Sequence, residues 1–357
     1  MKIKSVKSWK ENFGLIRPYT IASKGTTYDV SNILVEVSLE NGIKGLGASA
    51  PTEIDEGETF AKCETALHEN NLEWLIGREI ESIDKINTEL HKRMFMTPAA
   101  RAGIDIALYD AFALFKDVPL VDLLGRQYES LPTSITIGIK SIEESVEEAH
   151  EYERRGFKII KLKTGTSVEE DVARITKLRE SIDQSIAIRV DANQGYNTND
   201  YKKFIKNTRK LNVEFVEQPF PKENIDQMRN LDEQHKSLIA ADESLQNEED
   251  AALISTPPKA CGIFNIKLMK SGGIYSAMKI ASIANNANID LMWGCMDESR
   301  ISIAAGLHTA FACPNTKYID LDGSLDLARD LVSGGFEIKD GVMRTLDAPG
   351  LGVKMLS

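Results

Sequence analysis

The chain has few of the features that mark secreted, membrane-bound or metal-thiolate proteins. It has four cysteines in 357 residues, and none of them forms a CxxC pair. This usage is typical of reduced thiols in a cytosolic protein. The N-terminal segment lacks the apolar core of a signal peptide, and no apolar run reaches the roughly 18 residues that a membrane helix needs. We therefore expect a cytoplasmic protein without a membrane partner.

An excess of positive charge is also absent. The net charge is −11, which weighs against binding of nucleic acid or anionic membranes. Hydrophobic residues make up 42% of the chain and charged residues 27%, as in an ordinary globular protein. The length suits one large domain plus a smaller one. The formation of a homo-oligomer stays open at this point.

The first 125 residues predict a small α+β domain. Asn41-Gly42 is a turn signal between two β-rich segments, which indicates an antiparallel hairpin. Apolar residues at helical spacing then predict three helices, over residues 58–75, 83–93 and 98–116. We expect this part to cap the rest of the molecule.

From about residue 132 onward, short apolar strands alternate with amphipathic helices. A doubly wound open sheet would normally carry a Gly-rich phosphate loop after an early strand, and the sequence has none. The pattern therefore favours a modified TIM barrel, (β/α)7β, over residues 126–322, followed by a tail, 323–357, that packs back on the capping domain. The expected strands cover residues 133–138, 159–163, 187–191, 214–217, 238–242, 263–267, 290–293 and 318–322.

Most of the predicted strands end in an ionisable residue just after an apolar run. One such ending usually marks only the start of a polar loop, but six of seven consecutive strands end this way. Active sites of this architecture lie at the C-terminal ends of the strands, so these side chains should converge on one mouth. The residues are Lys161, Lys163, Asp191, Glu217, Asp242, Lys267, Asp320 and Asp322.

The acids on strands 3, 4 and 5 of the expected barrel predict a metal site. Asp191, Glu217 and Asp242 would repel one another strongly unless a cation joined them. Hard oxygen ligands with room for water or substrate favour Mg²⁺ over zinc. The alternative is a buried network in which these acids pair with lysines.

Two lysines flank this metal site. Lys163 on strand 2 and Lys267 on strand 6 face each other across an eight-membered ring. Bound Mg²⁺ would neutralise the negative charge of an enediolate as an α-proton leaves a carboxylate. The metal and the neighbouring Lys161 would also lower the pKa of Lys163, so that a neutral lysine acts as base. Bases on both faces of one carbon permit epimerisation by 1,1-proton transfer.

These motifs resemble the muconate-lactonizing-enzyme subgroup of the enolase superfamily over essentially the full length of the chain. The resemblance rests on Lys161-Leu162-Lys163, on Asp191 in VDANQGY, Glu217 in VEQP and Asp242 in ADES, and on Lys267 in NIKLMKSGG. It implies an Mg²⁺-dependent enzyme with Lys163 and Lys267 as the catalytic bases.

Within the subgroup, the chain looks most like the dipeptide epimerases, such as those acting on Ala-Glu. Their Asp-x-Asp at the end of strand 8 is similar to Asp320 and Asp322 in YIDLDG, which would bind the ammonium group of a dipeptide. The alternative is a turn with loop-capping aspartates. Further candidates for substrate contact are Lys161, Thr136, Asp297 and Glu298; Asn193 would support Asp191, and His308 would be structural.

Two loops of the first domain are expected to set specificity, RPYTIASKGTTYD and ASAPTEIDEGET. Ala-Glu epimerases should carry an arginine in the first loop, whereas this chain offers Lys24, which lacks the bidentate fork. We therefore favour Ala-Xaa dipeptides with a small or apolar second residue, with Ala-Glu as an option. The rival functions are a cycloisomerase or o-succinylbenzoate-synthase-like enzyme of the subgroup, and a barrel that binds a ligand without catalysis.

Overall fold

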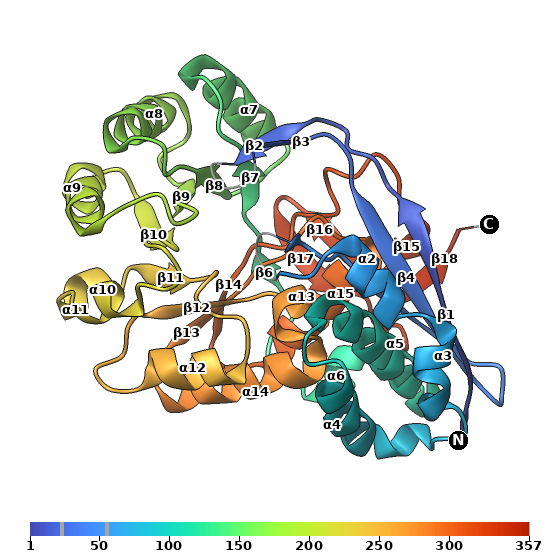
Figure 1. The fold of residues 1–357 in the computed structure, drawn as a ribbon. Helices are drawn as coiled ribbons and strands as arrows, with labels where there is room; N and C mark the ends of the chain where they lie inside the picture. The colour runs from blue at the N-terminus through green and yellow to red at the C-terminus, as the bar shows by residue number, and fades with distance from the viewer. Residues whose placement is uncertain (22–24, 54–56, 357) are drawn as a thin grey trace.

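The computed structural model describes residues 1–21, 25–53 and 57–356. Its centre is an eight-stranded parallel sheet in which the strands follow one another in chain order. Figure 1 shows these strands with helices on their outer side. The strands are β7 (Ile135–Ile137), β8 (Ile159–Lys163), β9 (Ala187–Asp191), β10 (Val213–Glu217), β11 (Ile239–Ala241), β12 (Ile263–Ile266), β13 (Asp290–Trp293) and β14 (Thr316–Ile319).

The sheet curls so that its first and last strands meet. A parallel bridge joins Thr133 to Ile319, and the Ser134 amide donates to the Ile319 carbonyl at 3.2 Å. Helices connect successive strands, and none follows β14 before the tail, so the (β/α)7β barrel that the sequence predicts is confirmed. The connecting helices are α7 (Ile142–Arg154), α8 (Val168–Ser181), α9 (Thr198–Thr208), α10 (Ile225–Arg229), α11 (Glu233–Lys236), α12 (Glu248–Ser255), α13 (Leu268–Ser271), α14 (Ile274–Asn286) and α15 (Arg300–Ala312).

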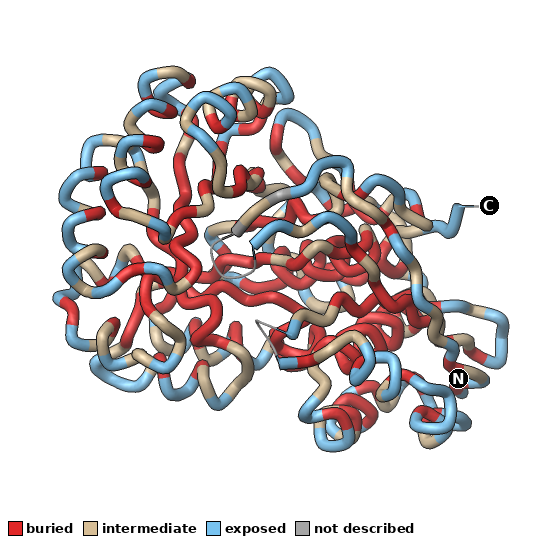
Figure 2. The backbone as a smooth tube through the Cα atoms, turned by 45° about the horizontal axis from the view of Figure 1, so that its top comes forward, coloured by how far each residue is buried: buried red, intermediate tan, exposed pale blue. Residues whose placement is uncertain are grey.

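Local sequence explains where the outer helices begin. Ser141 and Glu144 form a capping box at the start of α7, and Asn197 and Asp200 form another at the start of α9. These helices bury one face on the sheet and expose the other, as the alternation of buried and exposed segments in Figure 2 shows. In the described residues, no helix is long and apolar enough to cross a membrane.

The capping domain contains an antiparallel sheet, β1 (Ile3–Asn12), β4 (Ser31–Leu39) and β5 (Lys44–Ser49), and a hairpin, β2 (Tyr19–Ile21) and β3 (Gly25–Thr27). Helices α4 (Ile83–Arg93) and α5 (Pro98–Lys116) match the prediction. The single helix expected over 58–75 is wrong. This segment instead forms α2 (Phe60–Ala66), α3 (Glu69–Leu72) and the 3₁₀ turn η1 (Glu73–Leu75). A second 3₁₀ turn, η2 (Ile80–Ser82), precedes α4, and a short helix, α6 (Leu120–Leu124), follows α5.

That break has a local cause. His68 has an extended backbone and its Nδ1 accepts a hydrogen bond from the Asn70 amide, so it caps a new helix instead of continuing α2.

The last predicted strand is shifted. It ends at Ile319, so Asp320 and Asp322 lie in the segment that follows β14. The Asp320 carboxylate bonds the Ser134 hydroxyl and the Asp322 carboxylate bonds the Thr136 amide, both next to or on the neighbouring strand β7. These side-chain bonds replace further ladder bonds of the strand.

The tail adds short strands and contacts the capping domain. The Leu351 amide donates to Asp110 of α5 at 2.7 Å, and the Leu120 amide donates to the Gly350 carbonyl at 2.8 Å. These contacts hold the chain end on the first domain. The tail strands are β15 (Val332–Gly334), β16 (Phe336–Lys339), β17 (Val342–Thr345) and β18 (Val353–Met355), and β17 also pairs with β6 (Leu131–Pro132).

Candidate active site

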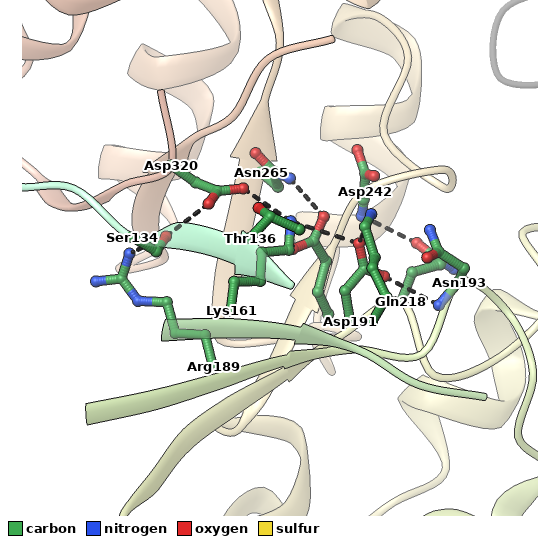
Figure 3. A network of polar contacts seen from close by, with 12 residues as sticks. Ser134, Thr136, Lys161, Arg189, Asp191, Asn193, Gln218, Asp242, Asn265 and Asp320 are labelled. Carbon is green, nitrogen blue, oxygen red and sulfur yellow. Dashed lines mark hydrogen bonds and ion pairs between the residues drawn. The ribbon is translucent and has the colours of Figure 1, made fainter. Parts of the chain in front are cut away.

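Three buried carboxylates meet at the C-terminal ends of neighbouring strands. Asp191 ends β9, Glu217 ends β10, and Asp242 directly follows β11. One oxygen of each lies within 4.8 Å of the others, and all three side chains are buried. The side-chain amide of Asn265 donates from Nδ2 to Glu217 Oε1 at 2.8 Å and so fixes that carboxylate. Figure 3 shows Asn265 beside the cluster. The geometry therefore provides a site that can hold a metal ion.

The two lysines of β8 lie on the same side of the strand, as their spacing predicts. Lys161 Nζ is 2.7 Å from Glu217 Oε2 and 2.8 Å from Asp320 Oδ2, whereas Lys163 Nζ is 2.7 Å from Asp191 Oδ2. Burial opposes the charge of both lysines, but the surrounding carboxylates outweigh it and raise the pKa of each. The lowered pKa that a catalytic base needs thus requires a cation that competes for these carboxylates.

A second lysine pair contacts the third carboxylate. Lys267, just after β12, donates to Asp242 Oδ2 at 2.8 Å, and Lys270 donates to Asp242 Oδ1 at 2.5 Å. Burial opposes the ionisation of Asp242, but both ammonium groups hold its pKa well below the usual value. Lys163 and Lys267 therefore each pair with a different carboxylate of the cluster.

The charges of the three acids fit a cation. Burial and the neighbouring Asp191 carboxylate raise the pKa of Glu217 to about 8, which shows the cost of placing like charges together. Two further buried oxygens beside the cluster, Asn193 Oδ1 and Glu243 Oε2, have no hydrogen-bond partner in the described part of the chain. Acceptors in this position suit the water ligands of a hard metal ion.

The segment after β14 faces this cluster through Lys161. Both oxygens of Asp320 are bonded, Oδ1 to the Ser134 hydroxyl at 2.6 Å and Oδ2 to Lys161. Arg189 supports Ser134 from below at 3.1 Å, so one polar chain runs from Arg189 to Lys161 (Figure 3). Asp320 is therefore a tightly held group.

Asp322 is bonded less completely. Its Oδ2 accepts from the Thr136 amide at 2.7 Å, and its Oδ1 makes a long contact with the Cys295 thiol at 4.0 Å. Burial and the Asp320 carboxylate raise the pKa of Asp322 to about 7. A positively charged group that met Oδ1 would relieve this unfavourable charge.

One pocket brings the lysines and acids together with further carboxylates. Asp297 follows β13 and Asp326 follows β14, and both line the pocket near Glu148 of α7. Burial, Asp297 and Glu148 raise the pKa of Asp326 to about 6. Lys140 and Arg17 pair with Glu148, whereas Asp326 forms no ion pair within the described ranges. The pocket therefore has an acidic side as well as a metal-binding side.

Family comparisons agree with this architecture in both parts of the chain. Residues 4–125 match the N-terminal domain of the mandelate racemase and muconate lactonizing enzyme family, and residues 144–356 match the enolase C-terminal domain-like family. The chain belongs to the enolase superfamily. The resemblance that its motifs indicate is thereby confirmed.

Several members of this superfamily resemble the chain over its full length. An L-Lys-D/L-Arg epimerase of Desulforapulum autotrophicum is 51% identical over 356 residues, which cover 100% of both chains. The structure of a dipeptide epimerase from Methylococcus capsulatus with Mg and the dipeptide L-Arg-D-Lys superposes with a TM-score of 0.98 at 47% identity, covering 99% of each chain. A hydrophobic dipeptide epimerase of Enterococcus faecalis is 35% identical and covers 99% of each chain.

Most residues that the sequence singles out lie in or under one pocket at the C-terminal ends of the barrel strands. Asp191 and Glu217 are fully buried beneath it. The expected contact Lys24 lies outside the described residues. The pocket lining includes Thr136, Lys161, Lys163, Asn193, Asp242, Lys267, Asp297, Asp320 and Asp322.

Three other candidate residues occupy defined positions in the structure. Glu298 is buried and accepts the Met296 amide at 2.7 Å, so its carboxylate supports the loop after β13 and is not among the pocket-lining residues. The Asn193 amide donates to Asp191 Oδ1 at 2.9 Å, which places Asn193 beside that carboxylate. His308 is buried, accepts the Val121 amide at 2.9 Å, and has a pKa lowered by burial to about 3, as a structural histidine would.

Sequence reasoning missed three groups near the pocket. Lys270 lies three residues after the predicted Lys267, and Glu243 lies directly after the predicted Asp242. Asp326 lies in a loop. The one available signal was the charge of Lys270 directly after the apolar Leu268 and Met269, whereas Glu243 lies between Asp242 and Ser244 and has no such signal. Asp326 has no signal of its own, because its place depends on how the loop after β14 folds back.

Proposed function

We propose that the protein is an Mg²⁺-dependent dipeptide epimerase that inverts the α-carbon of the C-terminal residue. The observation that carries the proposal is the pairing of Lys163 with Asp191 and of Lys267 with Asp242 on either side of one three-carboxylate cluster. Non-catalytic binding would give no reason to bury so many charges.

The proposed metal ligands are Asp191, Glu217 and Asp242. A divalent cation bound there supplies positive charge beside the substrate carboxylate, which makes the α-proton more acidic. With these carboxylates engaged by a cation, Lys163 would release Asp191 and Lys267 would release Asp242, and both ammonium groups would become available to the pocket.

The two lysines act on opposite faces of the α-carbon. One neutral lysine removes the proton at its Nζ, and the other, as an ammonium, returns a proton from the opposite side. They come from β8 and from the end of β12, which stand four strands apart in the sheet. Lys161 keeps its bond to Asp320, and its charge faces the substrate carboxylate.

The acidic side of the pocket recognises the substrate's positive groups. Asp322 Oδ2 accepts the Thr136 amide, and Asp322 Oδ1 binds the ammonium group at the substrate's N-terminus. Asp320 accepts a hydrogen bond from Lys161 and so positions that lysine. Asp297 and Asp326 attract a cationic side chain. This assignment gives the four aspartates that line this part of the pocket a role in binding positive charge.

The proposed substrate is accordingly a dipeptide that contains Lys or Arg. Two relatives support this choice, the L-Lys-D/L-Arg epimerase and the epimerase bound to L-Arg-D-Lys. The expectation of an Ala-Xaa dipeptide with a small or apolar second residue is corrected, because it rested on one loop lysine and took no account of Asp326.

A dipeptide library incubated in D₂O tests the proposal. We expect deuterium uptake at the α-carbon of the C-terminal residue, seen by mass spectrometry, and fastest for dipeptides with Lys or Arg. Removal of metal with EDTA should abolish the exchange, and Mg²⁺ should restore it. Exchange that persists in a metal-stripped sample, or exchange confined to dipeptides without a cationic side chain, would contradict the corresponding part of the proposal.

A further inference from the structure

A buried lysine outside the proposed mechanism contacts the metal-binding cluster. Lys270 lies on α13, three residues after Lys267, and only 3% of it is exposed. Its Nζ donates to Asp242 Oδ1 at 2.5 Å, to the Asp242 carbonyl at 2.6 Å and to the Asn265 carbonyl at 3.2 Å. An ammonium has three donors, so all of them are used.

The two oxygens of Asp242 are thereby divided between two lysines. Lys270 holds Oδ1 from inside the protein, and Lys267, which lines the pocket, holds Oδ2. Lys270 also bonds the main chain of Asp242, so the carboxylate and its backbone are fixed by one group. Oδ2 is the oxygen left for the pocket.

We propose that Lys270 is a positioning residue that presents Asp242 to the metal through Oδ2 alone and keeps Lys267 from pairing with both oxygens. The inference rests on the proposed role of Asp242 as a metal ligand. Without Lys270, Oδ1 would be buried and unpaired, and Lys267, which already holds Oδ2 of the same carboxylate, could turn to it. Lys267 would then stay bound to Asp242 and compete with the cation.

Helix α5 of the capping domain holds the segment that carries Lys270. Arg101 donates to the Ser271 carbonyl at 2.8 Å and to the Gly272 carbonyl at 3.2 Å, and Asp105 accepts the Ile274 amide at 2.5 Å. Gly272 has a φ of +80°, and an added Cβ would lie 2.0 Å from Arg101. The close packing fixes α13 against α5, so Lys270 is held rigidly under Asp242.

The direction in which Mg²⁺ affinity changes in Lys270→Met distinguishes a positioning role of Lys270 from the effect of its charge alone. Loss of a positive charge near the site would by itself strengthen the binding of a cation. A loss of affinity in Lys270→Met therefore reports lost orientation. We expect Mg²⁺ to bind about 10- to 100-fold more weakly, as for other groups that orient metal ligands, when the metal is titrated into the full-length protein by calorimetry.

Lys236 offers a matched control. It is also 3% exposed and pairs with a single acid, Glu233, on α11, away from the pocket lining. Lys236→Met should leave Mg²⁺ affinity unchanged. In Lys270→Met, proton exchange of the stereoisomer that depends on Lys267 should fall more than exchange of the isomer that depends on Lys163.

Unchanged or tighter Mg²⁺ binding by Lys270→Met would overturn this inference alone, whereas failure of the wild type to bind Mg²⁺ would overturn the proposed function with it. If the variant does not fold, a crystal structure of the wild type with Mg²⁺ decides. We expect Lys270 to keep Asp242 Oδ1 while Lys267 leaves Oδ2. Contact of both Asp242 oxygens with the metal, or departure of Lys270, would contradict the inference.

Discussion

The pKa values of two aspartates on the metal-binding side and of two on the acidic side shift in opposite directions. On the metal-binding side, Lys163 and Lys161 hold the pKa of Asp191 below its usual value despite burial, and Lys267 and Lys270 do the same for Asp242. On the acidic side, burial and neighbouring carboxylates raise the pKa of Asp322 to about 7 and of Asp326 to about 6.

The residue type is the same, so the difference comes from the partners. One side supplies its own cations from β8 and from the segment after β12. Within the described residues, Asp322 and Asp326 on the acidic side form no ion pair with a lysine or arginine, and we propose that a positively charged ligand balances their charge. This difference supports the proposal that the first side carries out the reaction and the second side selects the substrate.

The largest effect should come from removing the two bases of the metal-binding side. Lys163→Ala and Lys267→Ala should each lower the rate of epimerisation by about 10²–10⁴-fold, the usual contribution of a general base. Each variant should retain α-proton exchange with D₂O for one stereoisomer, and the two should retain opposite isomers. NMR of each pure isomer in D₂O measures this.

Both variants keep the three carboxylates, so their Mg²⁺ affinity serves as the control. It should not fall, because each substitution removes a competing ammonium from a metal ligand. Exchange of the same isomer by both variants would show that one lysine serves both faces.

On the acidic side, Asp322→Asn should have the largest effect. A charge-assisted hydrogen bond contributes about 1.5–3 kcal/mol, so kcat/KM for a free dipeptide should fall by about one to two orders of magnitude. The wild type should act poorly on the N-acetylated dipeptide, which has no ammonium group. In Asp322→Asn this preference should largely disappear.

Asp320→Asn provides the contrast, because Asp320 already bonds Ser134 and Lys161. It should lower turnover of free and N-acetylated dipeptides alike. If Asp320→Asn removes the preference for the free ammonium as completely as Asp322→Asn does, both aspartates bind that group, as the sequence motif suggests.

A smaller effect is expected for Asp326→Asn, since this side chain is partly exposed and solvent weakens its charge. The ratio of kcat/KM for a dipeptide with Lys to that for the same dipeptide with Ala should fall about five- to tenfold. The Ala dipeptide is the internal control and should react at an unchanged rate. If kcat/KM falls equally for both dipeptides, Asp326 supports the fold of the loop and does not bind the cationic side chain.

The sequence alone predicts the barrel because strands and ionisable endings repeat at one interval. Strands 159–163, 187–191 and 290–293 match the structure residue for residue. The helix over 58–75 fails because a cap at His68 interrupts an otherwise helical pattern. Such a cap depends on one side chain and one amide, which periodicity does not detect.

For the site, sequence predicts the residues that end a strand but not those held by tertiary contacts. Asp191 and Glu217 follow from their strand positions. The role of Lys270 depends on α13 being held by α5, and Asp326 reaches the pocket through the fold of a loop. Asp326, the proposed specificity residue, belongs to this second group, which explains why the substrate expectation needed correction while the reaction class did not.

The smallest effect is a pH dependence of substrate preference, and it follows from Asp326. Burial, Asp297 and Glu148 raise its pKa to about 6, while Arg155 and Arg17 act in the opposite direction. Below about pH 6 the carboxyl is neutral and attracts a cationic side chain weakly; above it the carboxylate is charged. The kcat/KM ratio of the Lys dipeptide to the Ala dipeptide should therefore rise between about pH 5 and 7.

The ratio isolates Asp326 from other groups, because Asp322 and the lysines act on both dipeptides equally. The rise should remain below the full effect of Asp326→Asn, since protonation at most removes the same charge. In Asp326→Asn the ratio should be nearly flat over this range. Steady-state kinetics from pH 5 to 8 with both substrates measures it, and a rise that persists in Asp326→Asn would show that a group other than Asp326 sets the pH dependence.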